Sequence, residues 1–224
     1  MAREANVSTI LLRNVPLFAS LDEAHLGVLV PMILRSRFAR NETIIGAGDP
    51  TDSLYIVISG RLKVMMCDEQ GREVILAILG TGEFFGEMGL LDDSPRSASV
   101  VTLEPCELLS ISKVDFKRTL AENSDLSLTV MRGLVKRLRE ADQKIGSLAL
   151  MDVYGRVARL LLQMAEDVDG EKVVVKKVSK QDIAKMIGAS REMVSRVMKD
   201  LQFGGYIEVR GRSIVLRDNI LLAE

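Results

Sequence analysis

Glycines at short intervals divide the segment from Phe38 to Ser112, and this feature restricts the folds open to the chain. Between them lie short runs rich in β-branched and aliphatic residues, a pattern typical of antiparallel strands joined by tight turns. Asp68–Gly71 is predicted to be one such turn. A row of hairpins of this kind favours a β-barrel or β-roll. The predicted strands are Leu54–Ser59, Leu62–Met66, Val74–Leu79, Ser97–Val101 and Glu107–Ile111.

Helical patterns flank this region on both sides. Leu21–Leu34 is predicted to be a short helix with Ser20 or Asp22 at its cap, which Pro31 breaks or kinks. A long helix is predicted over Asp125–Leu150, followed by a hinge and a second helix over Val153–Ala165 that Asp152 caps. Along the long helix, apolar residues recur at the spacing of a coiled-coil seam. They are Met131, Leu134, Leu138, Ala141, Ile145 and Leu148.

That narrow seam is flanked by many charged residues, among them Lys136, Arg137 and Glu140. Packing of the helix on its own domain is one interpretation. A second copy of the helix buries such a seam better, so we predict a homodimer.

The segment Ser179–Asp200 contains two short amphipathic patterns separated by Gly188, the spacing of a helix-turn-helix. Met193, Val194 and Val197 are predicted to face the domain core. The polar side carries forked donors and a carboxylate suited to base edges in the major groove. A strand is predicted over Val173–Val178, and a hairpin or wing with the turn Gly211-Arg212 follows the second helix. The candidate DNA-binding residues are Lys180, Gln181, Ser190, Arg191, Glu192, Ser195, Arg196, Lys199, Arg210 and Arg212.

Charge is distributed unevenly along the 224 residues, although the formal net charge is only −1. Between Glu171 and Arg217 there are eleven basic and five acidic residues, so a polyanion is expected to meet this part of the chain. The sequence lacks an apolar run long enough for a membrane span and a leader pattern, and a cytoplasmic protein is expected. Cys67 and Cys106 are predicted to be buried, inert thiols, and we predict no metal site.

A second motif lies in the β region, where Gly82-Glu83-Phe84-Phe85-Gly86-Glu87-Met88-Gly89 precedes Pro95-Arg96-Ser97-Ala98. Glycine lets backbone N–H groups approach an anion, Arg96 offers a forked cation, and Glu87 can accept from a sugar hydroxyl. From spacing alone, a turn with a surface Arg–Glu pair explains the motif equally well.

The order of these parts resembles the CRP/FNR family of bacterial transcription regulators, and within it the cyclic-AMP receptor proteins. The resemblance rests on GEMGLLDDSPRSASV, LALMDVYGRVA and SREMVSRVMKDL, and it covers Leu11 to Leu216. It implies an α+β chain with a double-stranded β-helix, or jelly-roll-like, cyclic-nucleotide-binding domain over residues 1–122. A dimerisation helix and hinge over 123–151 and a winged helix-turn-helix over 152–224 complete the expected organisation.

The resemblance also implies roles for the motif residues. Gly86, Glu87, Arg96, Ser97 and the Ala98 backbone match a phosphate-binding cassette, with Arg96 and Ser97 on the cyclic phosphate and Glu87 on the ribose 2′-hydroxyl. Val64, Leu76 and Met88 would wall the pocket. Arg191, Glu192 and Arg196 match a base-reading trio that implies palindromic TGTGA-like half-sites in double-stranded DNA.

The effector is less well defined by the sequence. Where the cyclic-AMP receptor protein bonds adenine through a Thr-Ser pair, this chain has Ala141-Asp142, and Asp142 is the remaining polar candidate. Cyclic AMP is the leading effector, while cyclic GMP, cyclic di-GMP and ligand-independent action stay open. RNA polymerase is an expected partner, although the predicted loop Glu166–Lys172 is too short to carry over that family's polymerase contact.

Two other classes of function were weighed. An enzyme acting on cyclic nucleotides lacks support, because the single histidine, His25, lies far from the cassette in a predicted helix. A dimeric scaffold without ligand leaves Arg96 and Glu87 unexplained. No catalytic residue and no cofactor are therefore predicted.

Overall fold

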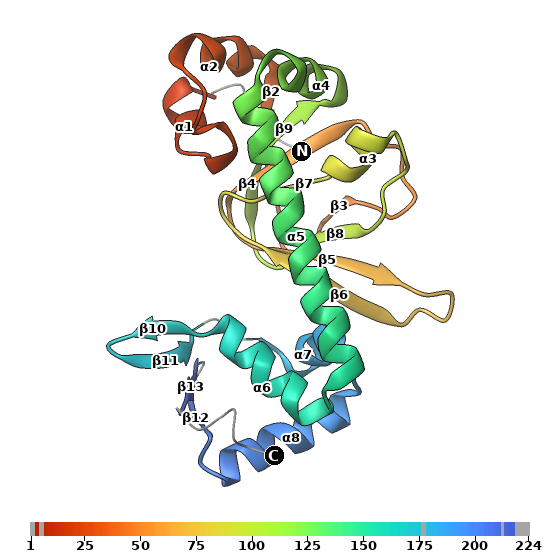
Figure 1. The fold of residues 1–224 in the computed structure, drawn as a ribbon, viewed down its shortest axis with the longest axis vertical. Coiled ribbons are helices and arrows are strands. Elements are labelled where there is room, and N and C mark those ends of the chain that lie inside the picture. The colour runs from red at the N-terminus through yellow and green to blue at the C-terminus, as the bar shows by residue number, and fades with distance from the viewer. Residues whose placement is uncertain (1–2, 5–6, 176–177, 212, 218–224) are drawn as a thin grey trace. The chain divides into compact units, whose positions relative to one another are not determined.

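The computed structural model describes residues 3–4, 7–175, 178–211 and 213–217 and divides the chain into two compact units, 1–137 and 138–224 (Figure 1). The division falls inside one long helix, α5 (Ser124–Leu150). Each unit is described by itself. The sequence-based division at 122 and 151 treats this helix as a separate part, whereas here its first half belongs to the first unit.

Two antiparallel sheets form the β-roll of the first unit. Non-consecutive strands are neighbours in both sheets, which is the crossed connectivity of a jelly roll. One sheet has the order β1 (Arg3–Glu4), β2 (Ile33–Phe38), β9 (Cys106–Ser112), β4 (Ser53–Ser59) and β7 (Phe84–Phe85). The other has the order β3 (Thr43–Ile45), β8 (Ser99–Thr102), β5 (Leu62–Cys67) and β6 (Glu73–Leu79).

The predicted strands and their turn are confirmed, with shifts of one or two residues at most ends. In the turn, the Asp68 carboxylate accepts the backbone N–H groups of Gln70 and Arg72, and Gly71 has a positive φ of 76°. One strand begins later than expected, at Ser99 instead of Ser97. Cys106 is buried as predicted, but Cys67, at the end of β5, is exposed, so the prediction for that thiol is wrong.

Strand β4 shows how the core is divided. Successive side chains of a strand point to opposite faces, so Leu54 and Ile56 face one side and Val57 faces the other. The first side packs against a cluster that includes Phe116 of α4 (Lys113–Glu122) and Leu126 of α5. Val57 joins a second cluster, formed with residues of the other sheet. The sheet is therefore buried on both faces.

The predicted helix over Leu21–Leu34 is shorter than expected. Helix α2 (Glu23–Leu29) begins at Asp22, whose carboxylate accepts the His25 N–H at 2.8 Å, and it ends where a 3-10 turn with Pro31 begins. The chain then enters β2, because Pro31 cannot continue the hydrogen-bond ladder of the helix. His25 is not a packing residue, since its ring lies at the surface beside Asp22. The remaining short elements here are α1 (Thr9–Arg13) and the 3-10 turns Pro16–Phe18 and Val30–Met32.

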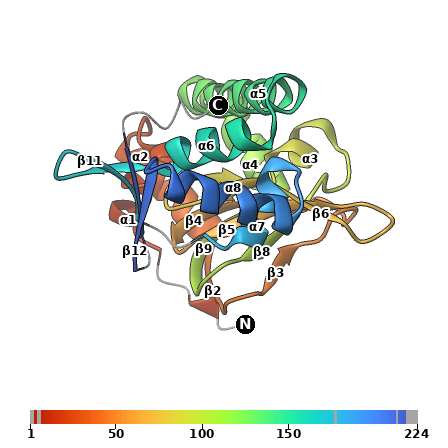
Figure 2. The ribbon, with the colours of Figure 1, turned by 90° about the horizontal axis from the view of Figure 1, so that it is seen from below.

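The second unit contains the predicted helix-turn-helix (Figure 2). Helix α6 (Val153–Met164), capped by Asp152, packs on α7 (Lys180–Ile187) and α8 (Arg191–Phe203). Ser179 and Ser190 cap α7 and α8, and Gly188 ends α7 with φ of 63°, a conformation that glycine adopts without strain.

A four-stranded sheet completes this unit, in the order β10 (Glu166–Val168), β11 (Glu171–Val174), β13 (Ser213–Leu216) and β12 (Ile207–Arg210). The predicted wing is confirmed as the hairpin β12–β13. The strand predicted over Val173–Val178 ends at Val174, and the segment expected to be a loop is the hairpin β10–β11. Its turn is made by Asp169 and Gly170, both with positive φ.

Candidate functional site

A recess in the first unit gathers most of the predicted ligand-binding residues. It measures about 430 Å³ out to its open mouth, a size that suits a small organic ligand. Strands β3, β5, β7 and β8, helix α3 (Glu87–Asp92) and helix α5 contribute to its walls. Its lining is Ile45, Val64, Phe85, Gly86, Glu87, Met88, Gly89, Arg96, Ser97, Ala98, Val100 and Arg137.

The backbone at Gly86 brings the cassette close to Arg96. Gly86 has φ of 87° immediately before α3, and a Cβ atom there would lie 2.4 Å from Arg96 Nη1. Glycine is thus required both for the conformation and for the space. The motif glycine marks a close approach of backbone and guanidinium, which spacing alone could not distinguish from an ordinary turn.

Arg96 is a buried cation, with only 4% of its side chain exposed. Nη1 donates to the Gly86 carbonyl at 2.8 Å, and Nη2 donates to the Ser53 carbonyl at 2.7 Å and to Asp52 Oδ1 at 3.3 Å. A guanidinium has more donors than these three contacts use. Fixed by two carbonyls at the wall of the recess, Arg96 is suited to pair with an anion.

Glu87 is a buried carboxylate, 1% exposed, and its two oxygens differ in their surroundings. Oε1 accepts from Arg137 Nη1 at 2.5 Å. Oε2 is buried without a hydrogen-bond partner among the described residues. Because an unpaired buried carboxylate oxygen is costly, Oε2 is a natural acceptor for a ligand hydroxyl.

Arg137 is the functional residue that sequence reasoning missed. From α5 it pairs with Glu87, donates to the Phe84 carbonyl and lies 5.0 Å from the centroid of the Phe84 ring. A Cβ atom at Gly133 would lie 2.9 Å from that ring, so glycine lets α5 approach β7 closely. In the sequence, Arg137 cannot be told from the neighbouring seam-edge charges, because its partner is 50 residues away.

The remaining predicted ligand residues divide into two groups. Ser97 is exposed at the recess, with its hydroxyl donating to Met88 Sδ at 3.8 Å, and Val64 and Ala98 supply apolar wall. Leu76 is not a lining residue. A register shift in the β5–β6 pairing, between Val64↔Ala77 and Met65↔Ile75, leaves Leu76 unpaired and 39% exposed. Asp142 belongs to the second unit, and its contact with a ligand stays a prediction.

Helix α3 is anchored at its far end by Asp93. The Asp93 carboxylate lies 2.6 Å from Lys113 Nζ and 2.8 Å from Lys117 Nζ, both on α4. Hydrogen bonds from the two ammonium groups lower the pKa of Asp93 to about 2. The end of the cassette helix is therefore tied to α4 by an ionised carboxylate.

The recognition surface lies on α7 and α8. Buried positions on α8 are Val194, Val197, Met198 and Leu201, whereas Met193, predicted to be buried, is 44% exposed. Lys180 Nζ donates to Ser195 Oγ at 3.1 Å, which joins the two helices. Hydrogen bonds from its own backbone N–H and from Ser190 lower the pKa of Glu192, which keeps this carboxylate an acceptor at neutral pH. The exposed members of the predicted set here are Lys180, Gln181, Ser190, Arg191, Glu192, Arg196 and Lys199.

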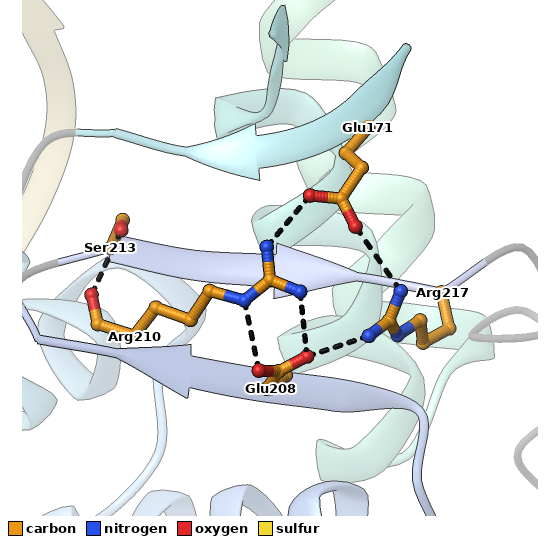
Figure 3. A network of polar contacts seen from close by, with 5 residues as sticks. All are labelled: Glu171, Glu208, Arg210, Ser213 and Arg217. Atoms are coloured by element: carbon orange, nitrogen blue, oxygen red, sulfur yellow. Dashed lines mark hydrogen bonds and ion pairs between the residues drawn. The ribbon is translucent and has the colours of Figure 1, made fainter. Parts of the chain in front are cut away.

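The predicted wing arginines differ from these residues. Arg212 lies outside the described residues. Arg210 is engaged by the carboxylates of Glu171 and Glu208 (Figure 3).

The predicted dimer seam is largely uncovered in the single chain. Met131, Leu138, Ile145 and Leu148 are each more than half exposed, and Ala141 is exposed as well. Leu134 instead packs partly against the core of the first unit. Among the described helices, none is long and apolar enough to cross a membrane. The same residues contain no cluster of three potential metal ligands.

Comparison with known proteins assigns both parts of the chain. Residues 35–123 match the family model of the cyclic nucleotide-binding domain, and residues 155–224 match that of the Crp-like helix-turn-helix domain. The cAMP-activated global transcriptional regulator Vfr of Pseudomonas aeruginosa is 36% identical over 202 residues, which are 86% of this chain and 93% of that protein. A CRP-like cAMP-activated global transcriptional regulator of Mycobacterium tuberculosis is 31% identical over 217 residues, covering 95% and 97%.

A solved structure agrees with these matches. The c-di-GMP responsive global regulator CLP of Xanthomonas campestris superposes with a TM-score of 0.74 at 31% identity, covering 87% of this chain and 99% of that one. Fold and site together define a DNA-binding transcription regulator controlled by a cyclic nucleotide. The chain belongs to the CRP/FNR family, as its sequence motifs predict.

The Asp93 anchor predicts a pH dependence of stability. Because the pKa of Asp93 in the fold lies below its ordinary value of 3.8, the ionised form stabilises the fold above about pH 4. That contribution is lost as the pH falls towards about 2. Asp93→Asn should lower the melting temperature at neutral pH, and the difference from wild type should shrink on acidification. Calorimetry of Asp93→Asn and of a control, Glu69→Gln in the β5–β6 turn, checks this. A difference that is independent of pH would contradict the anchor.

Proposed function

We propose that this chain acts as a homodimer whose affinity for palindromic TGTGA-like DNA is raised by cyclic AMP bound in the recess. The observation that carries the proposal is the pairing, in one recess, of the buried Arg96 with the buried and unpartnered Glu87 Oε2. A cyclic ribonucleotide carries one phosphate for the first and one 2′-hydroxyl for the second. Apolar side chains such as Val64 and Val100 are left for the base and sugar.

Cyclic AMP is favoured because both curated relatives described above are named as cAMP-activated. Cyclic di-GMP is the second candidate, since CLP is described as responsive to it. That ligand has two phosphates. Of the arginines that line the recess, Arg137 is already paired with Glu87, and Arg96 is left as the cation for a single phosphate.

The mechanism follows from the contact between Glu87 and Arg137. A hydroxyl on Oε2 of Glu87 would act on the carboxylate that Arg137 holds, and Arg137 lies on α5, which continues into the second unit. A ligand that binds one geometry of this helix better than another shifts the population towards it. In a dimer, the favoured geometry would place two recognition helices about 34 Å apart, one turn of the duplex. RNA polymerase is the partner we expect on the bound promoter.

The effector is tested by calorimetric titration with cyclic AMP, cyclic GMP, cyclic di-GMP and 2′-deoxy-cyclic AMP. Arg96→Gln should weaken cyclic AMP binding by roughly 10- to 100-fold, because a charge-assisted hydrogen bond is lost. Glu87→Gln should weaken cyclic AMP more than it weakens the 2′-deoxy ligand, because only the former offers the hydroxyl. Arg72→Gln, in the exposed β5–β6 turn, is the matched control.

Each other outcome of this titration has a distinct meaning. Wild-type affinity in Arg96→Gln would place the ligand elsewhere. Absence of binding by all four nucleotides, with DNA binding retained, would show a regulator that acts without them. Turnover of a nucleotide would identify an enzyme.

Base reading by α8 is tested with TGTGA palindromes substituted one base at a time. Arg196→Ala should lose about 1–3 kcal/mol of discrimination at one base pair, as expected for a bidentate contact. Lys180→Gln should weaken all sequences evenly, because a phosphate contact carries no base information. Fluorescence anisotropy measures both variants. Uniform weakening by Arg196→Ala would contradict its role in reading bases.

The dimer is tested through the exposed seam of α5. Leu138→Glu with Ile145→Glu should convert a dimer to a monomer, because charges would be buried at the helix–helix contact. The two side chains are 63% and 64% exposed in the single chain, so its own fold should survive. Sedimentation equilibrium measures the mass, with Val28→Glu on α2 as control. A wild-type monomer, or a dimer that survives both substitutions, would contradict the seam.

A further inference from the structure

The wing hairpin carries four charged residues joined in one continuous set of ion pairs, which we call the wing clamp (Figure 3). Its members are Glu171 on β11, Glu208 and Arg210 on β12, and Arg217 directly after β13. Arg210 forms a fork with Glu208, with Nε–Oε1 of 2.8 Å and Nη2–Oε2 of 2.9 Å. Its Nη1 reaches Glu171 Oε2 at 2.8 Å. Arg217 closes the set, at 3.3 Å from Glu171 and 2.6 Å from Glu208.

The sheet order explains why these side chains meet. Glu208 and Arg210 are two residues apart on β12, so they lie on the same face of the sheet. Strand β13 separates β12 from β11, and Val215 pairs with Glu208 on one side and Val173 on the other. The clamp therefore spans β13 and links the outer strand of the wing to β11, a strand from a different hairpin.

The clamp leaves Arg210 poorly placed to act as a phosphate contact. Its two-pronged contact with Glu208 is the strongest geometry available to an arginine, and the third contact, to Glu171, comes from another strand. The same pairings raise the pKa of Arg210 and lower the pKa of Glu208. With two cations and two carboxylates, the clamp has no net charge to offer a polyanion. A DNA phosphate would have to displace a carboxylate that is already paired.

We propose that Arg210 is a positioning residue, which locks the wing to β11 so that DNA meets the hairpin in one orientation. This revises the expectation that Arg210 contacts phosphate, and it rests on the proposed binding of DNA by α7 and α8. Isolated surface ion pairs contribute little, but bidentate pairs joined in a network are the recognised exception. Glu171 is a member of the clamp from outside the wing, so its loss should act on DNA binding through Arg210.

The salt dependence of DNA affinity separates the two roles. Each lost phosphate contact lowers the slope of log K against log salt concentration by about 0.9. Arg210→Gln should weaken binding by about two- to fivefold and leave the slope unchanged. Lys180→Gln, at a proposed phosphate contact, should lower the slope. Arg72→Gln in the first unit is the control for removal of one positive charge.

A double-mutant cycle and a conservative variant complete the test. If Arg210 acts through the clamp, Arg210→Gln should have little further effect in a Glu208→Gln background, because its partner is already gone. Arg210→Lys keeps the charge but loses the fork, so it should weaken binding as Arg210→Gln does. Thermal melts of each variant confirm that the unit is folded.

Three results would overturn the proposal. They are a slope lowered by about 0.9 in Arg210→Gln, full affinity in Arg210→Lys, and unchanged affinity in Arg210→Gln. If the wild-type protein binds no DNA at any salt concentration, the proposed function fails instead, which is a distinguishable outcome. If affinity falls with Arg210→Gln at constant slope, and the loss disappears in Glu208→Gln, the positioning role is supported.

Discussion

The ion pair between Glu87 and Arg137 connects the recess to the long helix, and the rest of the site depends on it. Glu87 is buried, and a buried carboxylate needs a partner to remain charged. Arg137 supplies that partner from α5 through Oε1 and leaves Oε2 facing no donor among the described residues. The protein thus holds a charged acceptor ready in the recess and ties it to the helix that continues into the second unit. A ligand at Oε2 acts directly on this connection.

Local chemistry explains why much of the fold was predictable from the sequence. Caps at Asp152, Ser179 and Ser190, the turn at Asp68–Gly71 and the break at Gly188 involve residues close together in the chain. Their hydrogen bonds need no tertiary partner. Pro31 was recognised as a breaker, yet the strand that follows it was not predicted. Apolar residues around Ile33 are compatible with a helix or a strand, and pairing with β9 decides between them.

The parts that were missed or misplaced depend on contacts between distant segments. Arg137 looks like any other charge beside the seam until Glu87 is placed against it. Leu76 fits the alternation of a lining residue, but a register shift in the pairing with β5 leaves it unpaired. The seam itself shows the same limit. One helical spacing serves two purposes along α5, because Leu126 and Val130 are buried in the first unit while Leu138 and Ile145 are exposed.

The wing clamp also changes how the charge of the second unit is interpreted. A count of residues between Glu171 and Arg217 gives a basic excess, and the count treats every arginine as available to DNA. Arg210 and Arg217 are paired with two carboxylates, so they add no net charge at the wing. The excess that remains includes residues of α7 and α8, among them Lys180 and Arg196. The electrostatic attraction and the base-reading side chains therefore coincide on the helix-turn-helix, and the wing contributes shape more than charge.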